Sequence, residues 1–240
     1  MATVVTVMDR DGFDQRTDNI VVVQPRRRRL LWVPRDVWSD VAGDRINTAY
    51  ARGGHAGLRE ALAGLGISVD HGLCVPRSTV EAALADLTVT VPVEEPMHLW
   101  YPMAPRTAIE DGRKPVDFLP PREELTGERI HQWLGARYGR DASTRSSDLD
   151  RIGRQQVLVR ALLRDHFDFA RVLRGPVEPS LSGPGAIDDL RRVRAWWSFA
   201  CADQVADEEI GGRKVLRLLS PHPRPPRWRR AVRRLRPNRA

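Results

Sequence analysis

The stretch IVVVQPRRRRLLWVP, residues 20–34, contains two apolar runs separated by a proline and four arginines. β-Branched and aromatic residues favour strands, and a proline with a polar run between two such segments indicates a hairpin. We therefore predict a β-hairpin, with the arginines of residues 26–29 solvated at its tip. A role of these arginines in binding a ligand is the alternative.

Further strands and helices are expected on both sides of this hairpin. Strands are predicted at residues 4–8, 71–75 and 88–93, and helices at 46–53, 55–66, 78–87, 125–138 (capped by Thr126), 146–167 and 187–206. Strands that alternate with helices predict an α/β fold, here a three-layer α/β/α sandwich with a central mixed β-sheet. Residues 94–121 are expected to form a long loop with at most one small hairpin, and residues 175–185 a linker.

Basic residues are distributed unevenly along the 240 residues, whose formal net charge is +8. Residues 221–240 contain eight arginines and no acidic residue, and the remaining residues carry equal numbers of basic and acidic side chains. We predict one domain at residues 1–220 and a basic tail at 221–240 that is disordered or lies as a short amphipathic helix on an anionic membrane. A neutral body does not favour nucleic-acid binding by the fold itself.

The common nucleotide-binding, hydrolase and zinc motifs are absent from the sequence. Cys74 and Cys201 each lie in an apolar stretch, far apart in the chain, and are expected to be buried free thiols. The sequence shows neither a signal-peptide pattern at its start nor an apolar run of roughly 18 residues. We therefore expect a cytoplasmic protein, with peripheral membrane contact through its tail.

The segment SSDLDRIGRQQVLVRALLRDHF, residues 146–167, has an unusual helical stripe. Residues three and four apart share a helix face, so Arg151, Arg154 and Gln155 continue into Leu158 and Leu162. Ser147 or Asp148 is the expected N-cap, and a helix N-terminus favours an anion. The stripe predicts a phosphate-sized anion beside an apolar cavity. Ion pairs between these arginines and nearby carboxylates are the alternative.

Charged residues also stand at the ends of the predicted strands: Asp9 after the first, Arg16 and Asp18 before the second, and Arg35 after the third. Such ends can converge on one rim of the sheet, where α/β proteins commonly bind ligands. Arginine binds phosphate oxygens with a fork of N–H groups, and carboxylates can hold a Mg²⁺ ion that spans neighbouring phosphates. This residue set predicts phosphoryl chemistry without a nucleophilic serine or cysteine.

Several motifs occur in the order seen in the LytR-CpsA-Psr family, and the chain resembles the catalytic domain of that family over residues 4–173. QRTDNIVVVQPRRRRLLWVPRDVW resembles the family's R-x-D, hairpin and P-R-D, and RINTAYARGG resembles its K-I-N-x-A-Y-x-x-G-G. DHGLCV, VTVPV, LTGERIHQWLGAR and DLDRIGRQQ follow in the same order.

The resemblance implies an α/β/α domain that binds a polyprenyl pyrophosphate between sheet and helices. Family members transfer a glycopolymer phosphate from that lipid to a cell-wall acceptor. By position, Asp9 and Asp18 would bind Mg²⁺, and with Arg35 and Arg137 they would form the catalytic set. The residues expected at the pyrophosphate are Arg16, Arg35, Arg45, Arg137, Arg151, Arg154 and Gln155.

Three departures from the family pattern accompany this resemblance. Gly135 stands at the first arginine of the usual R-x-R and leaves Arg137 alone, unless Arg140 substitutes. The usual R-S-D-T is replaced by RTDN, and the membrane anchor of the relatives is not found.

The departures leave two enzymatic hypotheses open. The first is a Mg²⁺-dependent phosphotransferase or pyrophosphohydrolase that acts on a polyprenyl-pyrophosphate-linked substrate. The second is a soluble enzyme that ionises or cyclises a shorter prenyl diphosphate, as in terpene metabolism. A non-enzymatic binding or regulatory module that contacts nucleic acid or membrane through the tail is a third hypothesis.

Two aromatic segments have open roles in these hypotheses. Trp196 and Trp197 are expected in the last helix, packed against the sheet or lining the lipid pocket. Residues 97–103, MHLWYPM, could cover that pocket as a lid.

Overall fold

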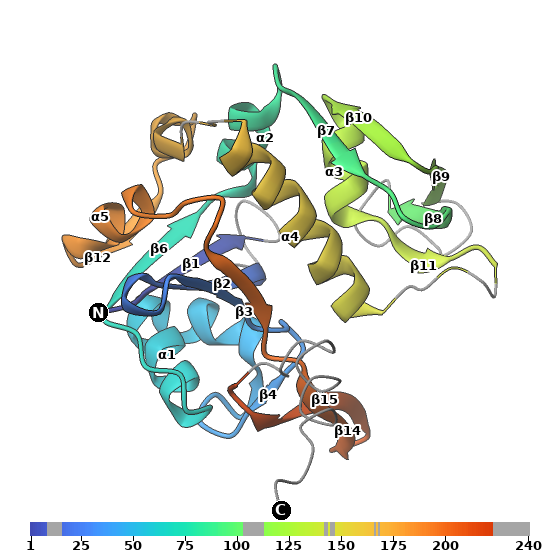
Figure 1. Cartoon of the computed structure of the whole chain (residues 1–240). Coiled ribbons are helices and arrows are strands. Elements are labelled where there is room, and N and C mark those ends of the chain that lie inside the picture. The colour runs from blue at the N-terminus through green and yellow to red at the C-terminus, as the bar shows by residue number, and fades with distance from the viewer. Residues whose placement is uncertain are drawn as a thin grey trace, which may run out of the picture.

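A computed structural model of the chain describes residues 1–8, 16–102, 113–141, 144, 147–165, 167 and 169–222. At its centre is a mixed six-stranded sheet, which confirms the predicted fold class (Figure 1). Its order is β12 (Ser180–Ser182), β6 (His71–Val75), β1 (Thr3–Met8), β2 (Thr17–Gln24), β3 (Arg29–Trp32) and β13 (Ser198–Cys201). β6 is parallel to β1 and β13 is parallel to β3, whereas the other pairs are antiparallel.

The predicted hairpin is formed by β2 and β3, with Val22 opposite Leu31. A short 3₁₀ turn, η1 (Pro25–Arg27), connects the strands, and Arg28 after it has a φ of 48°. Side chains alternate between the two faces of a sheet. Val22 and Leu31 therefore face one layer of helices, while Val23 and Leu30 face the other.

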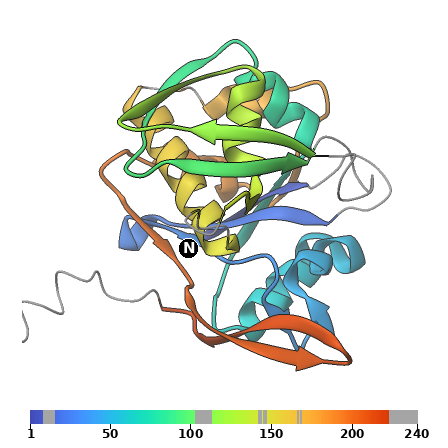
Figure 2. The same cartoon turned by 90° about the vertical axis from the view of Figure 1, so that its right-hand side faces the viewer.

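One face of the sheet packs on α1 (Ala49–Gly64), which follows a short 3₁₀ segment, η2 (Ile46–Thr48). The two helices predicted in this region are joined in α1 across a kink at Gly53 and Gly54. Gly54 has a φ of 55°, a value that glycine adopts without steric cost. On this side lie also β4 (Trp38–Ser39), β5 (Asp44–Arg45), and the hairpin of β14 (Gln204–Ile210) and β15 (Arg213–Ser220) (Figure 2).

The other face of the sheet packs on α4 (Asp148–Arg164), α2 (Arg77–Leu84) and α5 (Gly185–Arg191) (Figure 1). Ser147 is the N-cap of α4, and it is one of the two residues that the sequence analysis predicted for this position. Its hydroxyl accepts a hydrogen bond from Asp150 N, and the Asp150 carboxylate accepts one from Ser147 N in return, which is a capping box.

A further layer of short strands covers the outer side of α4 (Figure 2). It contains β7 (Thr88–Pro92), β8 (Met97–Pro102), β9 (Arg113–Phe118), β10 (Arg122–Thr126), α3 (Glu128–Gly135) and β11 (Arg137–Gly139). The small hairpin that the prediction allowed within residues 94–121 is formed by β8 and β9, which pair as antiparallel strands. Residues 103–112 lie outside the described chain.

The helix predicted at residues 125–138 is shorter than expected. Leu125 and Thr126 end strand β10, Gly127 with a φ of 46° precedes α3, and Arg137 already belongs to β11. Thr126 is therefore a strand residue rather than a helix cap.

The helix predicted at residues 187–206 was also wrong beyond Arg191. Residues 198–201 form β13 beside β3, where Phe199 stacks on Trp32 with ring centroids 5.6 Å apart. Pairing with the open edge of a central sheet overrides the helical propensity of this segment. The expected linker also contains a strand, β12, and the 3₁₀ segment η3 (Phe169–Arg174) precedes it.

Smaller predictions have mixed outcomes. Cys74 is a buried free thiol as predicted, whereas Cys201 forms no disulfide but is only partly buried. No helix in the described part of the chain is long and apolar enough to cross a membrane. The predictions for the basic tail concern mostly residues 223–240, which lie outside the described residues.

Candidate functional site

Asp18 is the centre of a cluster of three arginines that come from distant parts of the chain. Its Oδ1 accepts hydrogen bonds from Arg35 Nη1 at 2.5 Å, Arg151 Nη1 at 2.9 Å and Arg137 Nη2 at 3.2 Å. Arg151 Nη1 also lies 3.1 Å from Oδ2. Four of the residues predicted for the site are therefore in direct contact, and we call them the Asp18 cluster.

Each member of the Asp18 cluster is positioned at an end of a structural element. Asp18 is at the start of β2, Arg35 follows β3, Arg137 begins β11, and Arg151 is in the first turn of α4. The first turn of a helix has free backbone N–H groups and the positive end of the helix dipole, so it adds to the positive potential of the arginines. Of the residues expected at strand ends, Asp18 and Arg35 come together on one rim, and Arg137 and Arg151, which were expected on helices, join them there.

The charge state of the cluster follows from its contacts. Burial alone would raise the pKa of the Asp18 carboxyl, but Arg151, Arg35 and Arg137 outweigh it and lower the pKa to about 2. Asp18 is therefore ionised at neutral pH, and among the described residues three guanidinium groups surround this one carboxylate. Guanidinium forks also bind phosphate oxygens, so the cluster can contact a phosphate or pyrophosphate group.

Two adjoining cavities lie beside this cluster. A polar cavity of about 150 Å³ is lined by Asp18 and Arg137 together with Tyr101, His131 and Gly135. An apolar cavity of about 210 Å³ lies between the sheet and helices α2, α4 and α5. Residues that line both cavities are Val7, Asn19, Val80 and Leu134.

The apolar cavity follows the length of the hairpin. Val21, Val23 and Leu30 form its floor on the sheet, and Leu158 and Leu162 of α4 form part of its roof. As the stripe predicted, Arg151 lies at the charged cluster and the leucines lie along the apolar cavity, whereas Arg154 does not reach the cluster. The ion pair of Arg151 with Asp18 is of the kind that the alternative named. A charged group joined to a hydrocarbon chain is the kind of molecule that this pair of cavities fits.

Gln155 occupies the part of the α4 stripe between the arginine and the leucines. It lines the apolar cavity and is buried, yet neither its amide nitrogen nor its amide oxygen has a hydrogen-bond partner in the described structure. A buried amide without a partner is costly, and such groups commonly mark a place where a ligand supplies the partner.

Gln155→Met is expected to raise the free energy of unfolding by about 1 kcal/mol, because it removes the unpartnered amide at similar volume. It should also weaken binding of a ligand that hydrogen-bonds there. Gln156→Met is the matched control, because Gln156 Nε2 donates to Ala200 O at 3.1 Å and its loss should destabilise the protein. Urea unfolding of both variants measures this, and equal destabilisation would contradict a ligand role for Gln155.

The structure does not bring every predicted residue into the cluster. Arg154 is buried and donates from Nε to Trp133 O at 3.1 Å and from Nη2 to Ala136 O at 2.5 Å. Burial, and next Arg151, lower the pKa of Arg154 to about 10. Its guanidinium group thus ties α4 to the end of α3.

The remaining predicted residues have other positions. Arg45 forms an ion pair with Asp36 at 3.4 Å and donates to Lys214 O at 2.7 Å, so its contacts lie toward the β14–β15 hairpin. Arg16 is exposed, two residues before Asp18. Asp9 lies outside the described residues.

Some residues at the polar cavity were not predicted from the sequence. His131, Arg77 and Glu81 line it, and Arg77 Nε donates to Glu81 Oε1 at 2.7 Å. Burial lowers the pKa of His131. His131 lies within the LTGERIHQWLGAR motif and Arg77 follows the predicted strand at residues 71–75, but neither residue was assigned a role from the sequence. Tyr101 also lines this cavity, and it belongs to the segment that we expected to act as a lid.

Gly135 is on the wall of the polar cavity, at the position where the resemblance expects an arginine. Arg140 does not replace that arginine, because it pairs with Asp117 at 2.8 Å and lies over the Trp100 ring at 5.9 Å. The cluster therefore has one guanidinium group fewer than the family pattern implies.

Gly135→Arg is expected to strengthen binding of inorganic pyrophosphate by about tenfold, since one charge-assisted hydrogen bond contributes about 1.5 kcal/mol. A Cβ at this position would lie 3.1 Å from Tyr101 Cε2, so the tyrosine ring must shift slightly. Gly135→Ala has the same steric effect without the charge and serves as control. Equal affinities of the two variants in calorimetry would show that residue 135 does not face the anion.

The two tryptophans also have different positions from those expected. Trp197 is buried against the sheet core, which agrees with the packing alternative, whereas Trp196 is 64% exposed and lies beneath the Arg28 guanidinium at 5.1 Å. Neither residue lies in a helix.

Comparison with known proteins places this geometry in a family. The model of the LytR_cpsA_psr family matches residues 5–177. The chain therefore belongs to the LytR-CpsA-Psr family, whose members are enzymes that transfer glycopolymers from polyprenyl-pyrophosphate carriers to the cell wall. No curated protein matches the chain.

Solved structures share the fold at low sequence identity. A structure of TagT bound to LI-WTA has a TM-score of 0.60 and 17% identity, covering 91% of this chain and 84% of the other. TagV of B. subtilis has a TM-score of 0.59 and 15% identity over 91% and 89% of the two chains. TagU of B. subtilis has a TM-score of 0.56 and 16% identity over 90% and 89%.

Proposed function

We propose that this protein is a phosphotransferase or pyrophosphohydrolase that acts on a polyprenyl-pyrophosphate-linked substrate. The observation that supports this most strongly is the junction of the Asp18 cluster with the apolar cavity. The pyrophosphate would bind at the cluster, and the prenyl chain would lie between the sheet and α4. The family's glycopolymer transfer and its lipid-linked substrates agree with this arrangement.

The proposed catalysis depends mainly on charge neutralisation. Phosphoryl transfer spreads negative charge over the phosphate oxygens, and guanidinium groups held in place before the reaction stabilise that charge without reorganisation. Asp18 holds Arg35, Arg137 and Arg151 close together despite their mutual repulsion. In this proposal Arg35 and Arg137 contact the pyrophosphate directly, and Arg151 connects the cluster to α4.

A magnesium ion is part of the proposal, with Asp18 as its protein ligand. No group of three or more His, Cys, Asp or Glu side chains in the described part of the chain could hold a metal. One ionised carboxylate among three arginines fits Mg²⁺ only together with substrate phosphates, which is a common mode for this ion. When bound, the ion would neutralise charge on the two phosphates. Asp9, the second proposed ligand, lies outside the described residues.

Calorimetry tests this requirement directly. Mg²⁺ alone is expected not to bind at millimolar concentration, whereas Mg²⁺ with inorganic pyrophosphate should bind more tightly than pyrophosphate alone. Asp18→Asn should remove the enhancement. Binding of Mg²⁺ without pyrophosphate, or an enhancement that Asp18→Asn retains, would remove Asp18 from the metal site.

A second candidate function is the ionisation or cyclisation of a shorter prenyl diphosphate. The size of the apolar cavity favours it, because about 210 Å³ lies below the roughly 300 Å³ at which typical ligand sites begin and suits a short chain.

Product analysis distinguishes the two functions. The protein is incubated with Mg²⁺ and either farnesyl or undecaprenyl pyrophosphate. Release of phosphate, or phosphoryl transfer to an added glycan acceptor, supports the first function, and release of a hydrocarbon or prenyl alcohol isomers supports the second. An Arg137→Ala variant must lose either activity if the Asp18 cluster is responsible.

We also propose a peripheral membrane contact through the basic tail, as the arginine content of residues 221–240 suggests. Deletion of residues 223–240 should abolish sedimentation with anionic vesicles and leave turnover of a short soluble substrate intact. Retained sedimentation would exclude the tail as the contact.

A further inference from the structure

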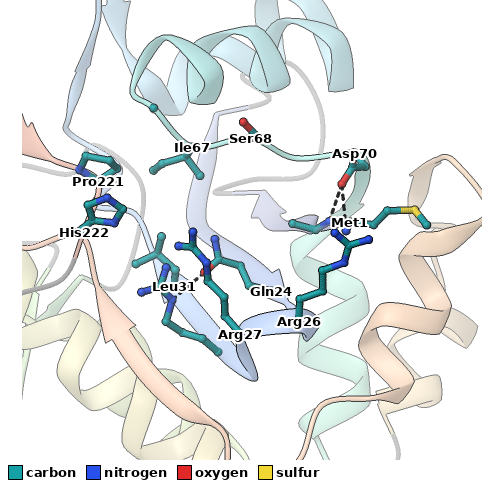
Figure 3. A pocket seen from close by; sticks show the side chains of 13 residues that line it. Met1, Gln24, Arg26, Arg27, Leu31, Ile67, Ser68, Asp70, Pro221 and His222 are labelled. Carbon is teal, nitrogen blue, oxygen red and sulfur yellow. Dashed lines mark hydrogen bonds and ion pairs between the residues drawn. The ribbon is translucent and has the colours of Figure 1, made fainter.

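A second basic cavity lies at the end of the sheet opposite to the Asp18 cluster. Strand register fixes this separation: Thr17, beside Asp18, pairs with Met8, whereas Val23, near the hairpin turn, pairs with Thr3. β2 has eight residues, so about 20 Å separates its two ends. The cavity has a volume of about 380 Å³ and opens between the hairpin turn, the segment before β6, and the end of β15 (Figure 3).

Three arginines of the hairpin line this cavity. In Figure 3 the side chains of Arg26 and Arg27 extend from the turn toward the segment that carries Ile67 and Asp70. Neither Arg26 nor Arg27 has a hydrogen-bond or ion-pair partner among the described residues. Arg29 is half-buried, and its Nε donates to Gln24 Oε1 at 2.7 Å, which fixes the direction of its guanidinium group.

The charges in this cavity are not balanced. Asp70 is its acidic residue, and its Oδ2 already accepts a hydrogen bond from Ala2 N at 2.7 Å and lies 3.8 Å from Met1 N. Burial, and next the nearby Arg27, lower the pKa of Arg29. Arg26 and Arg27 are exposed, as predicted for a hairpin tip, and together with Arg29 they line one concave surface.

Arg28, the fourth arginine of the hairpin, does not line the cavity and contacts an aromatic ring instead. Arg28 leaves the cavity and lies over the exposed Trp196 ring, 5.1 Å from its centroid. This cation–π contact gives Arg28 a partner within the protein. Arg28 therefore serves as a control for the three arginines that line the cavity.

The remaining walls define the class of ligand. Leu31, Ile67 and Pro221 provide an apolar side, and His222 and Ser68 add polar groups (Figure 3). Arginine forks match the oxygens of phosphate groups, and the volume exceeds that of a phosphate alone and falls in the range of small-molecule sites.

We propose that this cavity binds the phosphate or diphosphate group of a small organic ligand, with Arg26, Arg27 and Arg29 as its cationic contacts. This site goes beyond the proposed function, because it is remote from the Asp18 cluster and lies on the α1 side of the sheet. The phosphate can belong to a free metabolite or to a lipid headgroup, since the chemistry of recognition is the same.

Isothermal calorimetry with inorganic pyrophosphate tests the proposal. Wild-type protein should bind two equivalents, one at each end of the sheet. Arg27→Gln and the double variant Arg27→Gln/Arg29→Gln should weaken one of the two sites by about tenfold or more. Arg28→Gln, the matched control on the same turn, should retain both, and Arg137→Ala should weaken the other site only.

Vesicles separate the two sources of phosphate. If Arg27→Gln reduces sedimentation with vesicles of phosphatidylcholine and phosphatidate while Arg28→Gln does not, the ligand is a lipid headgroup. If both variants sediment equally and only the binding of soluble pyrophosphate differs between them, it is a free phosphate. Pyrophosphate binding that is equal in Arg27→Gln and Arg28→Gln, with circular dichroism unchanged, would overturn the proposal. That result would leave the function proposed for the Asp18 cluster unaffected.

Discussion

Arg151→Ala is expected to lower the free energy of unfolding by about 3 kcal/mol, at the lower end of the range for a broken buried ion pair. Arg151 is 2% exposed and its Nη1 lies within 3.1 Å of both carboxylate oxygens of Asp18. Its loss leaves the partly buried Asp18 with the more exposed Arg35 and Arg137, and it also opens a gap at the first turn of α4. Urea unfolding at pH 7 measures the change.

A conservative variant serves as the control for this prediction. Arg151→Lys keeps the charge and should recover part of the lost stability, although lysine cannot reproduce the guanidinium fork. A change below about 0.5 kcal/mol for Arg151→Ala would mean that its ion pair with Asp18 contributes no more than a typical surface ion pair, and it would contradict the expected result.

The same ion pairs predict a dependence of stability on pH. The pKa of Asp18 is lowered from 3.8 to about 2, so folding favours the ionised form. Its contribution, about 2 kcal/mol, is complete well above pH 3.8 and is lost as the pH falls toward 2. Asp18→Asn should remove this component of acid destabilisation, and Arg151→Ala should raise the pKa of Asp18 in a carboxyl titration by nuclear magnetic resonance. An unchanged pKa would contradict the cluster.

Arg137→Ala is expected to weaken binding of pyrophosphate at the Asp18 cluster by about 10- to 100-fold, which corresponds to about 1.5 to 3 kcal/mol for a charge-assisted contact. Its side chain is 30% exposed, so stability should fall by less than about 1 kcal/mol. Arg140→Ala is the matched control three residues away, because Arg140 pairs with Asp117. If both variants bind pyrophosphate like the wild type, Arg137 is only a partner of Asp18.

The sequence was informative wherever a local pattern determined the outcome. The hairpin at residues 20–34, the strand ends with Asp18 and Arg35, and the stripe on α4 all follow from periodicity and turn chemistry. Arg151 and Arg154 are arginines on the same stripe of α4, and the sequence does not distinguish their roles. They differ in the groups of β2 and α3 that they contact. One faces the Asp18 carboxylate and the other faces carbonyl oxygens of Trp133 and Ala136.

Tertiary pairing explains most of the differences between the predicted and observed elements. Residues 198–201 form a strand because they pair with the edge of β3, and residues 137–139 form a strand, not the end of a helix, because they pair with β8. The second basic cavity was not foreseen for the same reason. Its arginines were expected at a solvated turn. The other walls of the cavity come from the segment before β6 and the residues after β15, which are distant in the sequence.

The central claim is that the Asp18 cluster and the apolar cavity bind the two ends of one molecule. Val159 lines the apolar cavity and not the polar one, so Val159→Trp should fill part of the space proposed for the prenyl chain. The most direct measurement is the Arg137-dependent affinity of farnesyl pyrophosphate and of inorganic pyrophosphate for the wild type and for this variant. We expect Val159→Trp to weaken binding of farnesyl pyrophosphate by about tenfold or more and to leave binding of inorganic pyrophosphate unchanged. Equal changes for both ligands, or no change for either, would contradict the claim.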